Sequence, residues 1–308
     1  AIGGHLGVMA RARPVEEVIA DPATDPALKQ RLQTARRIRE FASKRLGLPD
    51  NPSYASYAQI DRPYVVWNVF AAPELSVEPK AECFPFTGCV SYRGFYKEDE
   101  ARRHAQALRE AGYDVYVGGV PAYSTLGWFD DPLLSTFIGY PDAQLARLVF
   151  HELAHQLVYA KNDTTFNESF AVAVEEEGVK RWLESEGRAA DLEAFRVSQR
   201  RKRDFIALVA DTRKRLDDIY RADLPRETKL EQKRAELEKL RAAWPGAIPA
   251  DANNAFLVSI GVYTDLVPMF ERLLAQSGSL EEFYARAKKL ASSGKRDIHN
   301  LAERRSGT

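Results

Sequence analysis

The chain of 308 residues has little of several features that mark whole classes of protein. It has no apolar run near the ~20 residues that a membrane-spanning helix needs. Lys and Arg number 44, and Asp and Glu also number 44, so the formal net charge is zero. This balance gives no electrostatic argument for binding nucleic acid or an anionic membrane. The sequence therefore predicts neither a nucleic-acid partner nor a transmembrane segment, and it indicates no oligomeric state.

Cysteine is also scarce, with only Cys83 and Cys89, in ECFPFTGCV. Their spacing is not the close pairing of a zinc ribbon. A small disulfide, which would suit an oxidising compartment, and two buried free thiols both remain open. The sequence starts with Ala rather than Met, so we expect a chain that was either processed or cut for expression, and any export signal would lie before this residue.

Apolar residues make up 45% of the chain, enough for a real core. Residues 1–139 mix helix and strand patterns. Apolar spacing, acidic starts and glycine stops predict the helices, and β-branched and aromatic runs predict the strands. The predicted helices are 25–48 and 98–112, and the predicted strands are 62–73 and 113–123.

The rest of the chain is predicted to be almost entirely helical. Residues 140–186 hold two helices, and 245–308 end with two packed helices, 253–278 and 279–291. Residues 187–244 are rich in charge and are interrupted by Pro225, which predicts a long antiparallel hairpin with a solvated charged face. The fold class is therefore α+β, mainly helical.

The stretch FHELAHQLVYAKNDTTFNESFAVAVEEEG, residues 150–178, carries two of the five histidines. On a helix, His151 and His155 share one face, so both rings can donate nitrogen to one zinc ion. Glu152 lies about 100° around the helix, where it can reach a water at the metal as a general base. The alternative is an amphipathic helix with two core histidines. The specificity of His-Glu-x-x-His favours the metal site.

A catalytic zinc usually takes three protein ligands. Glu168, near the start of the next predicted helix, is the favoured third ligand. Thr165 and Glu168 also fit a capping box, in which Glu168 would only bind a backbone N–H. Glu175, seven residues further on the same face, could ligate instead or hold one of the ligands in place.

HELAHQ followed by NESFAVAVEEEG resembles the gluzincin metallopeptidases, especially the zinc aminopeptidases. In those enzymes a second helix starts with N-E-x-F-A, and its Glu is the third ligand. The matching stretch here is 167–171, so the resemblance implies Zn²⁺ bound by His151, His155 and Glu168. The connection between the two helices is shorter than in the well-known aminopeptidases, so this loop must differ.

A wider resemblance covers nearly the whole chain. CFPFTGCVSYRGFY, VGGVPAYSTLGWFDDPLL and YTDLVPMF are similar to the predicted aminopeptidases of proteobacteria, many of which are described as lipoproteins. This implies a cell-envelope location, either periplasmic or anchored on the periplasmic side by an N-terminal lipid that is missing here. That location in turn implies a disulfide between Cys83 and Cys89.

The leading hypothesis is a zinc-dependent peptidase acting on peptide substrates through zinc-activated water, with aminopeptidase activity implied by resemblance alone. The implied fold is a single zincin-like catalytic domain over 1–308, with a small N-terminal sheet packed on a helical core and the hairpin as an insertion. The competing hypothesis is a non-catalytic envelope protein with a structural zinc and a protein-binding hairpin.

A peptidase also needs a donor for the oxyanion. Tyr263, which follows a glycine break in GVYTDLVP, is the favoured residue, and Tyr123 and Tyr140 are rivals. GGVPAYSTLGW can form an edge strand along which a peptide lies, or an ordinary turn.

Overall fold

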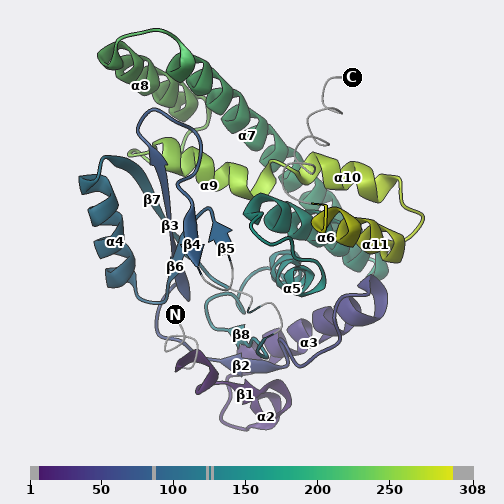
Figure 1. The fold of residues 1–308 in the computed structure, drawn as a ribbon. Coiled ribbons are helices and arrows are strands. Elements are labelled where there is room, and N and C mark those ends of the chain that lie inside the picture. The colour runs from purple at the N-terminus through teal and green to yellow at the C-terminus, as the bar shows by residue number, and fades with distance from the viewer. Residues whose placement is uncertain (1–6, 85–87, 123–124, 126–127, 294–308) are drawn as a thin grey trace. The chain divides into compact units, whose positions relative to one another are not determined.

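The computed structural model describes residues 7–84, 88–122, 125 and 128–293 (Figure 1). The chain forms two compact units, and each is described by itself. Unit 1 comprises Ala1–Val66, Gly119–Phe195 and Asp265–Thr308. Unit 2 comprises Trp67–Gly118 and Arg196–Thr264. The single catalytic domain over 1–308 stays a prediction.

The predicted α+β, mainly helical class is confirmed. Helices carry most of the chain, and the described strands form small sheets of two or three. Among the described residues, no helix combines the length and the apolar character needed to cross a membrane.

Unit 1 combines a small sheet with long helices. Strand β1 pairs antiparallel with β2, and β2 pairs parallel with β8, with Tyr57 opposite Leu133. The predicted helix 25–48 is confirmed as α3, which Asp25 caps at its start and Gly47 ends in the left-handed region. The elements are β1 (Arg13–Pro14), α2 (Val15–Ala20), α3 (Pro26–Leu46), β2 (Ser56–Ala58), β8 (Leu133–Leu134), α5 (Asp142–Leu157), α6 (Thr164–Ser185), α10 (Val267–Ala275) and α11 (Leu280–Ala291).

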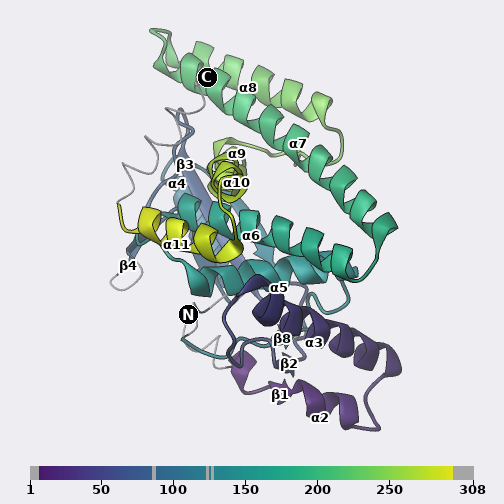
Figure 2. The same ribbon diagram turned by 90° about the vertical axis from the view of Figure 1, so that its right-hand side faces the viewer.

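Helices α5 and α6 pack closely against each other in unit 1 (Figures 1 and 2). Gly178 of α6 permits this approach. A Cβ atom at this position would lie 2.7 Å from Cδ2 of Phe150 and 2.9 Å from Cδ1 of Leu46. Because close-packed interiors leave no room for such an atom, the missing side chain lets α6 lie directly against the residue before His151.

The main sheet of unit 2 has strand order β6-β3-β7, so β7 lies at an edge. Helix α4 covers this sheet, and its residues Ala101, Ala105 and Leu108 pack against Trp67 and Val69 of β3. The strand predicted at 113–123 is confirmed as β7, whereas the binding of a peptide along GGVPAYSTLGW stays a prediction. The elements are β3 (Val66–Pro73), β6 (Arg93–Phe95), α4 (Glu98–Glu110) and β7 (Tyr113–Val120), of which β3 begins and β7 ends in unit 1.

A short hairpin carries the two cysteines. Strands β4 (Glu82–Phe84) and β5 (Gly88–Val90) pair antiparallel with Cys83 opposite Cys89. The two residues form a disulfide, as the resemblance implied. Their Cα atoms are 3.9 Å apart, closer than in most disulfides.

The charged hairpin is confirmed as α7 (Ala189–Arg221) and α8 (Arg226–Ala243), which Figure 2 shows side by side. Lys229 donates to the Tyr220 carbonyl near the turn, and Arg215 binds Glu236 further from the turn. These contacts show that the two helices are antiparallel. Their apolar side chains join the core of unit 2 through Val209, Leu216, Leu237 and Leu240.

The predicted helix 253–278 is wrong as a single element. The structure has α9 (Asn254–Thr264) and α10, separated at Asp265 and Leu266. Pro268 lies in the first turn of α10, where its missing N–H costs nothing, so it starts a new helix instead of continuing one. The glycine break expected before Tyr263 is also wrong, because Gly261 lies inside α9.

Candidate metal centre

Helix α5 presents both histidines to one point. Pro141 and Asp142 begin the helix, and its apolar residues are buried, so the turn that carries His151 and His155 is fixed by the core. The Nε2 atoms of the two rings are 3.1 Å apart, and the rings meet edge to face. The predicted convergence of the two nitrogens is therefore present.

Glu168 reaches the same point from α6. The helix begins at Thr164, and the side chain of Asp163 caps it by accepting from the N–H of Phe166 at 3.0 Å. The capping box of Thr165 and Glu168 is therefore wrong, since Thr165 lies inside the helix. Glu168 is 6% exposed, and its carboxylate faces the histidines instead.

Asn167 holds the short loop between the two helices in place. The Asn167 side chain accepts from the N–H of Ala160 at 2.7 Å and donates to its carbonyl at 2.9 Å. Asn167 is itself buried. This clamp fixes the start of α6, and therefore Glu168, relative to the end of α5.

The three donor atoms fit a zinc ion. His151 Nε2 lies 3.3 Å and His155 Nε2 lies 3.6 Å from Glu168 Oε2, and the two nitrogens are 3.1 Å apart. A tetrahedral zinc with bonds of about 2.0–2.1 Å spaces its ligand atoms about 3.3–3.4 Å apart. The observed triangle has edges close to this value. Among the described residues, this is the cluster of His, Cys, Asp and Glu that could hold a metal.

Glu175 contacts His151 from outside the donor triangle. Its Oε2 lies 2.9 Å from Nδ1 of His151, on the opposite side of the ring from the donor triangle. A carboxylate at this place keeps the proton on Nδ1 and leaves Nε2 free for a metal. Arg147, one turn before His151, lies 3.7 Å from the other oxygen of Glu175.

The charged groups of the cluster strongly shift one another's pKa values. Burial alone would lower the pKa of His151, but hydrogen bonds to Glu168 and Glu175 raise it to about 10. Burial alone would raise the pKa of Glu168, but the charge of His155 and the hydrogen bond to His151 lower it to about 2. The shifts of both pKa values therefore favour a positive charge where the three donor atoms meet.

Glu152 lies beside this triangle with its carboxylate uncommitted. It is 9% exposed, and within the described part of the chain it makes no hydrogen bond. Burial raises its pKa, which makes the carboxylate a stronger base than one in water. The arrangement can therefore take a proton from a water beside the three donors.

The tyrosines predicted as oxyanion donors are not brought to the cluster by any described contact. The side chain of Tyr263 and the whole of Tyr123 lie outside the described residues. Tyr140 lies before α5, which begins at Asp142, about 14 Å of helix before His151.

Two residues near the cluster were missed by sequence reasoning. Tyr159, just after α5, is 39% exposed, and burial together with the charge of Glu168 raises its pKa. Arg147 could have been found, since it precedes His151 by one turn on the same face. Tyr159 gives no such signal, because it follows the end of the helix.

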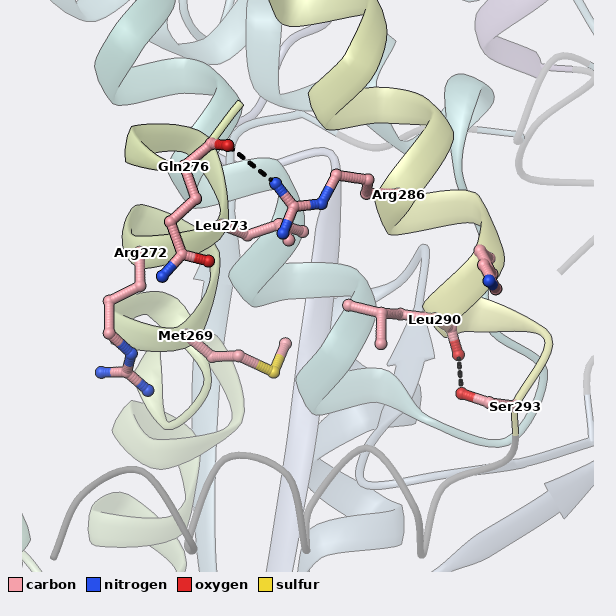
Figure 3. A pocket seen from close by; sticks show the side chains of 8 residues that line it. Met269, Arg272, Leu273, Gln276, Arg286, Leu290 and Ser293 are labelled. Carbon is pink, nitrogen blue, oxygen red and sulfur yellow. Dashed lines mark hydrogen bonds between the residues drawn. The ribbon is translucent and has the colours of Figure 1, made fainter. Parts of the chain in front are cut away.

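A separate pocket of about 410 Å³ lies between α10 and α11 (Figure 3). Arg272, Arg286 and Lys289 surround an apolar floor that includes Met269 and Leu290. The lining residues that the structure describes include no histidine and no acidic residue. The pocket is therefore not part of the metal cluster.

Comparison with known proteins bears on the identity of the chain. A family model described as "Putative aminopeptidase" matches residues 1–301, which include the whole cluster. No curated protein and no solved structure matches the chain. Because the family model spans nearly all of the sequence, the chain belongs to the putative aminopeptidase family.

Proposed function

We propose that this protein is a zinc-dependent peptidase of the gluzincin type and acts as an aminopeptidase. The observation that carries the proposal is the donor triangle of His151, His155 and Glu168, with edges of 3.1–3.6 Å, beside an uncommitted Glu152. Family membership supports peptide hydrolysis as the reaction.

The donor triangle would hold Zn²⁺, which when bound acts as a Lewis acid and lowers the pKa of a water. Glu152 accepts a proton from the attacking water and later delivers it to the leaving amine. Glu175 keeps His151 in the tautomer that offers Nε2. The buried walls of α5 and α6 exclude other water from these groups.

The oxyanion donor is proposed to be a tyrosine. Sequence favours Tyr263, and the position of Tyr159 adds a second candidate. The raised pKa of Tyr159 keeps its hydroxyl protonated, so it can donate, and its 39% exposure leaves it accessible. Tyr159→Phe and Tyr263→Phe would separate the two, since only the donor's loss lowers turnover with zinc retained.

The alternative of a structural zinc has less support. Structural sites usually have four protein ligands. Within the described residues, the cluster comprises three. A fourth position without a protein ligand suits a catalytic centre.

We also propose a cell-envelope location. The disulfide between Cys83 and Cys89 supports it, because disulfides persist in oxidising compartments. Mass measurement after alkylation without reductant, on protein from the native compartment, tests the proposal. Two alkylated cysteines would contradict it.

The decisive experiment compares the wild type with Glu152→Gln. The variant keeps shape and hydrogen-bonding reach but cannot accept the proton, so turnover of a peptide should fall about 10²–10⁴-fold. Elemental analysis should find one zinc per chain in both proteins. If the wild type binds zinc but hydrolyses no peptide, the proposed function fails.

A further inference from the structure

The pocket between α10 and α11 lies within unit 1 and has no part in the proposed reaction. Its volume of about 410 Å³ falls within the range of about 300–1,000 Å³ that small-molecule sites occupy. Two stripes of residues, each with the spacing i, i+4, i+7 that keeps side chains on one helix face, line it from opposite sides. The stripes are Met269, Leu273 and Gln276 along α10, and Arg286, Leu290 and Ser293 along α11.

Aromatic rings in the core set the separation of the two helices. Phe270 of α10 and Phe283 of α11 are fully buried and meet edge to face, with ring centroids 6.4 Å apart. Phe170 of α6 packs against both rings, at 5.6 Å and 5.8 Å. Because close-packed rings hold α10 and α11 at this distance, the pocket is a fixed part of the fold.

Arg286 reaches from α11 to the end of α10 (Figure 3). Its Nη1 donates to the Gln276 carbonyl at 3.0 Å and to the Ser277 hydroxyl at 3.2 Å, and it lies 3.8 Å from the Glu282 carboxylate. A guanidinium group has five N–H donors. Among the described residues, the donors on Nη2 and Nε have no hydrogen-bond partner. The group is therefore held in place by one nitrogen while two others are available to a ligand.

The lining carries positive charge of which much is unmatched. Arg272 and Lys289 line the pocket beside Arg286, and the described lining includes no acid. The side chains of Arg272 and Lys289 form no ion pair or hydrogen bond with any described residue. Three cations around one cavity attract an anion more strongly than any of them would alone.

The floor of the pocket is apolar. Met269 is 7% exposed, and Figure 3 shows its side chain and that of Leu290 pointing toward each other across the pocket. An inorganic anion would leave this floor facing water. A peptide would bring main-chain N–H and C=O groups that need partners, whereas the Ser293 hydroxyl already donates to the Leu290 carbonyl at 2.8 Å. The lining therefore favours an anionic head on an unbranched apolar chain.

We propose that this pocket binds a free fatty acid with a single acyl chain. Nη2 and Nε of Arg286 donate to the carboxylate as a pair, the geometry that makes Arg–carboxylate contacts strong. Arg272 and Lys289 add favourable potential, and the acyl chain covers the apolar floor, where the flexible Met269 adapts to it. The volume is near the lower end of the range for small-molecule sites, so it admits one chain and not the two chains of a phospholipid.

Calorimetry on the full chain with monomeric dodecanoate tests the proposal. We expect one dodecanoate bound per chain. Each methylene group removed from water strengthens binding about fourfold, so octanoate, which has four fewer, should bind at least about tenfold more weakly. Inorganic phosphate should not displace dodecanoate. Equal affinity for octanoate and dodecanoate, or displacement by phosphate, would overturn the proposal, because the apolar floor would then contribute nothing.

Substitution of the anchor should have a large effect on dodecanoate binding. Arg286→Gln removes the guanidinium group, so affinity should fall about 10–100-fold, the range for charged hydrogen bonds. Ser277→Ala removes one partner of Nη1 and keeps the guanidinium group, so affinity should stay at the wild-type level. Thermal unfolding checks that both variants are folded. Unchanged affinity in folded Arg286→Gln would contradict the proposed site.

A second pair of variants remains informative if Arg286→Gln does not fold. Lys289→Gln gives up no side-chain contact with a described residue, and it should lower affinity several-fold by reducing the local charge. Lys288→Gln is the matched control, since its neighbouring side chain is also exposed but does not line the pocket. Equal losses in the two variants would indicate general attraction to the protein surface and would overturn the proposal.

Two other ligands separate this proposal from its alternatives. Retention of the protein on phosphatidylglycerol vesicles without binding of free dodecanoate would assign the charged residues to a membrane surface and overturn the proposal. Tighter binding of N-acetyl-leucine than of dodecanoate would assign the pocket to a peptide C-terminus, with the same consequence. Absence of dodecanoate binding below millimolar concentration would also overturn it.

Discussion

Two pairs of helices carry dense ionisable side chains, and burial separates their behaviour. In α5 and α6, Glu152, His155, Glu168 and Glu175 are each less than a tenth exposed. In α7 and α8, a typical pair such as Arg221 and Asp217 has side chains that are 78% and 33% exposed. Exposed pairs are worth little, whereas buried charges must be matched or they destabilise the fold.

Burial alone does not mark function, as Lys233 of α8 shows. It is 7% exposed, yet its ammonium group donates to the Asp114 carboxylate at 2.6 Å and to the Glu74 carbonyl at 2.8 Å. These partners satisfy it. In the metal cluster, by contrast, two ring nitrogens face each other at 3.1 Å, which needs a shared cation or proton. Ligand atoms of the same kind that face one another therefore indicate a binding site, whereas a buried charge with its own partners indicates a structural contact.

Removal of a ligand should have the largest effect. Glu168→Gln and His155→Ala each leave two of three donors, so zinc affinity should fall by more than the 10–100-fold typical of a supporting residue. Elemental analysis after dialysis measures this. Full zinc content in Glu168→Gln would show that the convergence is not a metal site.

Removal of the Glu175 carboxylate should have an intermediate effect on zinc affinity. Glu175→Gln takes the carboxylate from Nδ1 of His151 while all three donors remain, so zinc affinity should fall about 10–100-fold. Competition with a chelator gives the affinity. Glu177→Gln is the matched control, since Glu177 binds Lys180 and Arg181 on the same helix. Equal losses in the two variants would refute a specific role for Glu175.

Zinc affinity should also depend on pH. The raised pKa of His151, about 10 in the metal-free protein, means that zinc displaces a proton over the whole neutral range. Affinity should therefore increase about tenfold per pH unit and level off only as pH approaches that pKa. A plateau that begins near pH 7 would show that the two glutamates do not hold a proton on His151.

The smallest effect is expected in the hairpin. Arg221→Ala removes an exposed ion pair with Asp217, so the free energy of unfolding should change by about 1 kcal/mol or less. Zinc content and peptide hydrolysis should remain at the wild-type level. Loss of hydrolysis at full zinc content would assign the hairpin a part in the reaction and weaken the contrast between the two helix pairs.

Features that depend on residues close together in the sequence were predicted from local sequence patterns. The spacing of His151 and His155 predicted their convergence, and α3 and α4 followed from apolar periodicity and stop signals. The split of 253–278 was missed because the pattern stays apolar across Asp265. The contact between the N–H of Tyr54 and the carbonyl of Asp131 could not be predicted from the sequence either, because it joins two segments that are far apart in the chain.

The absence of a side chain at Gly178 helps to set the spacing of the donor atoms in the candidate metal centre. A methyl group there would start 2.7 Å from the Phe150 ring, so the helices would have to yield by several tenths of an ångström. Metal–ligand distances in proteins hold to about ±0.2 Å. The displacement caused by one methyl group, on the same helix as Glu168 and Glu175, is therefore comparable with the whole margin that zinc allows. The spacing of the three donor atoms therefore depends on Gly178, which is not one of the residues that supply them.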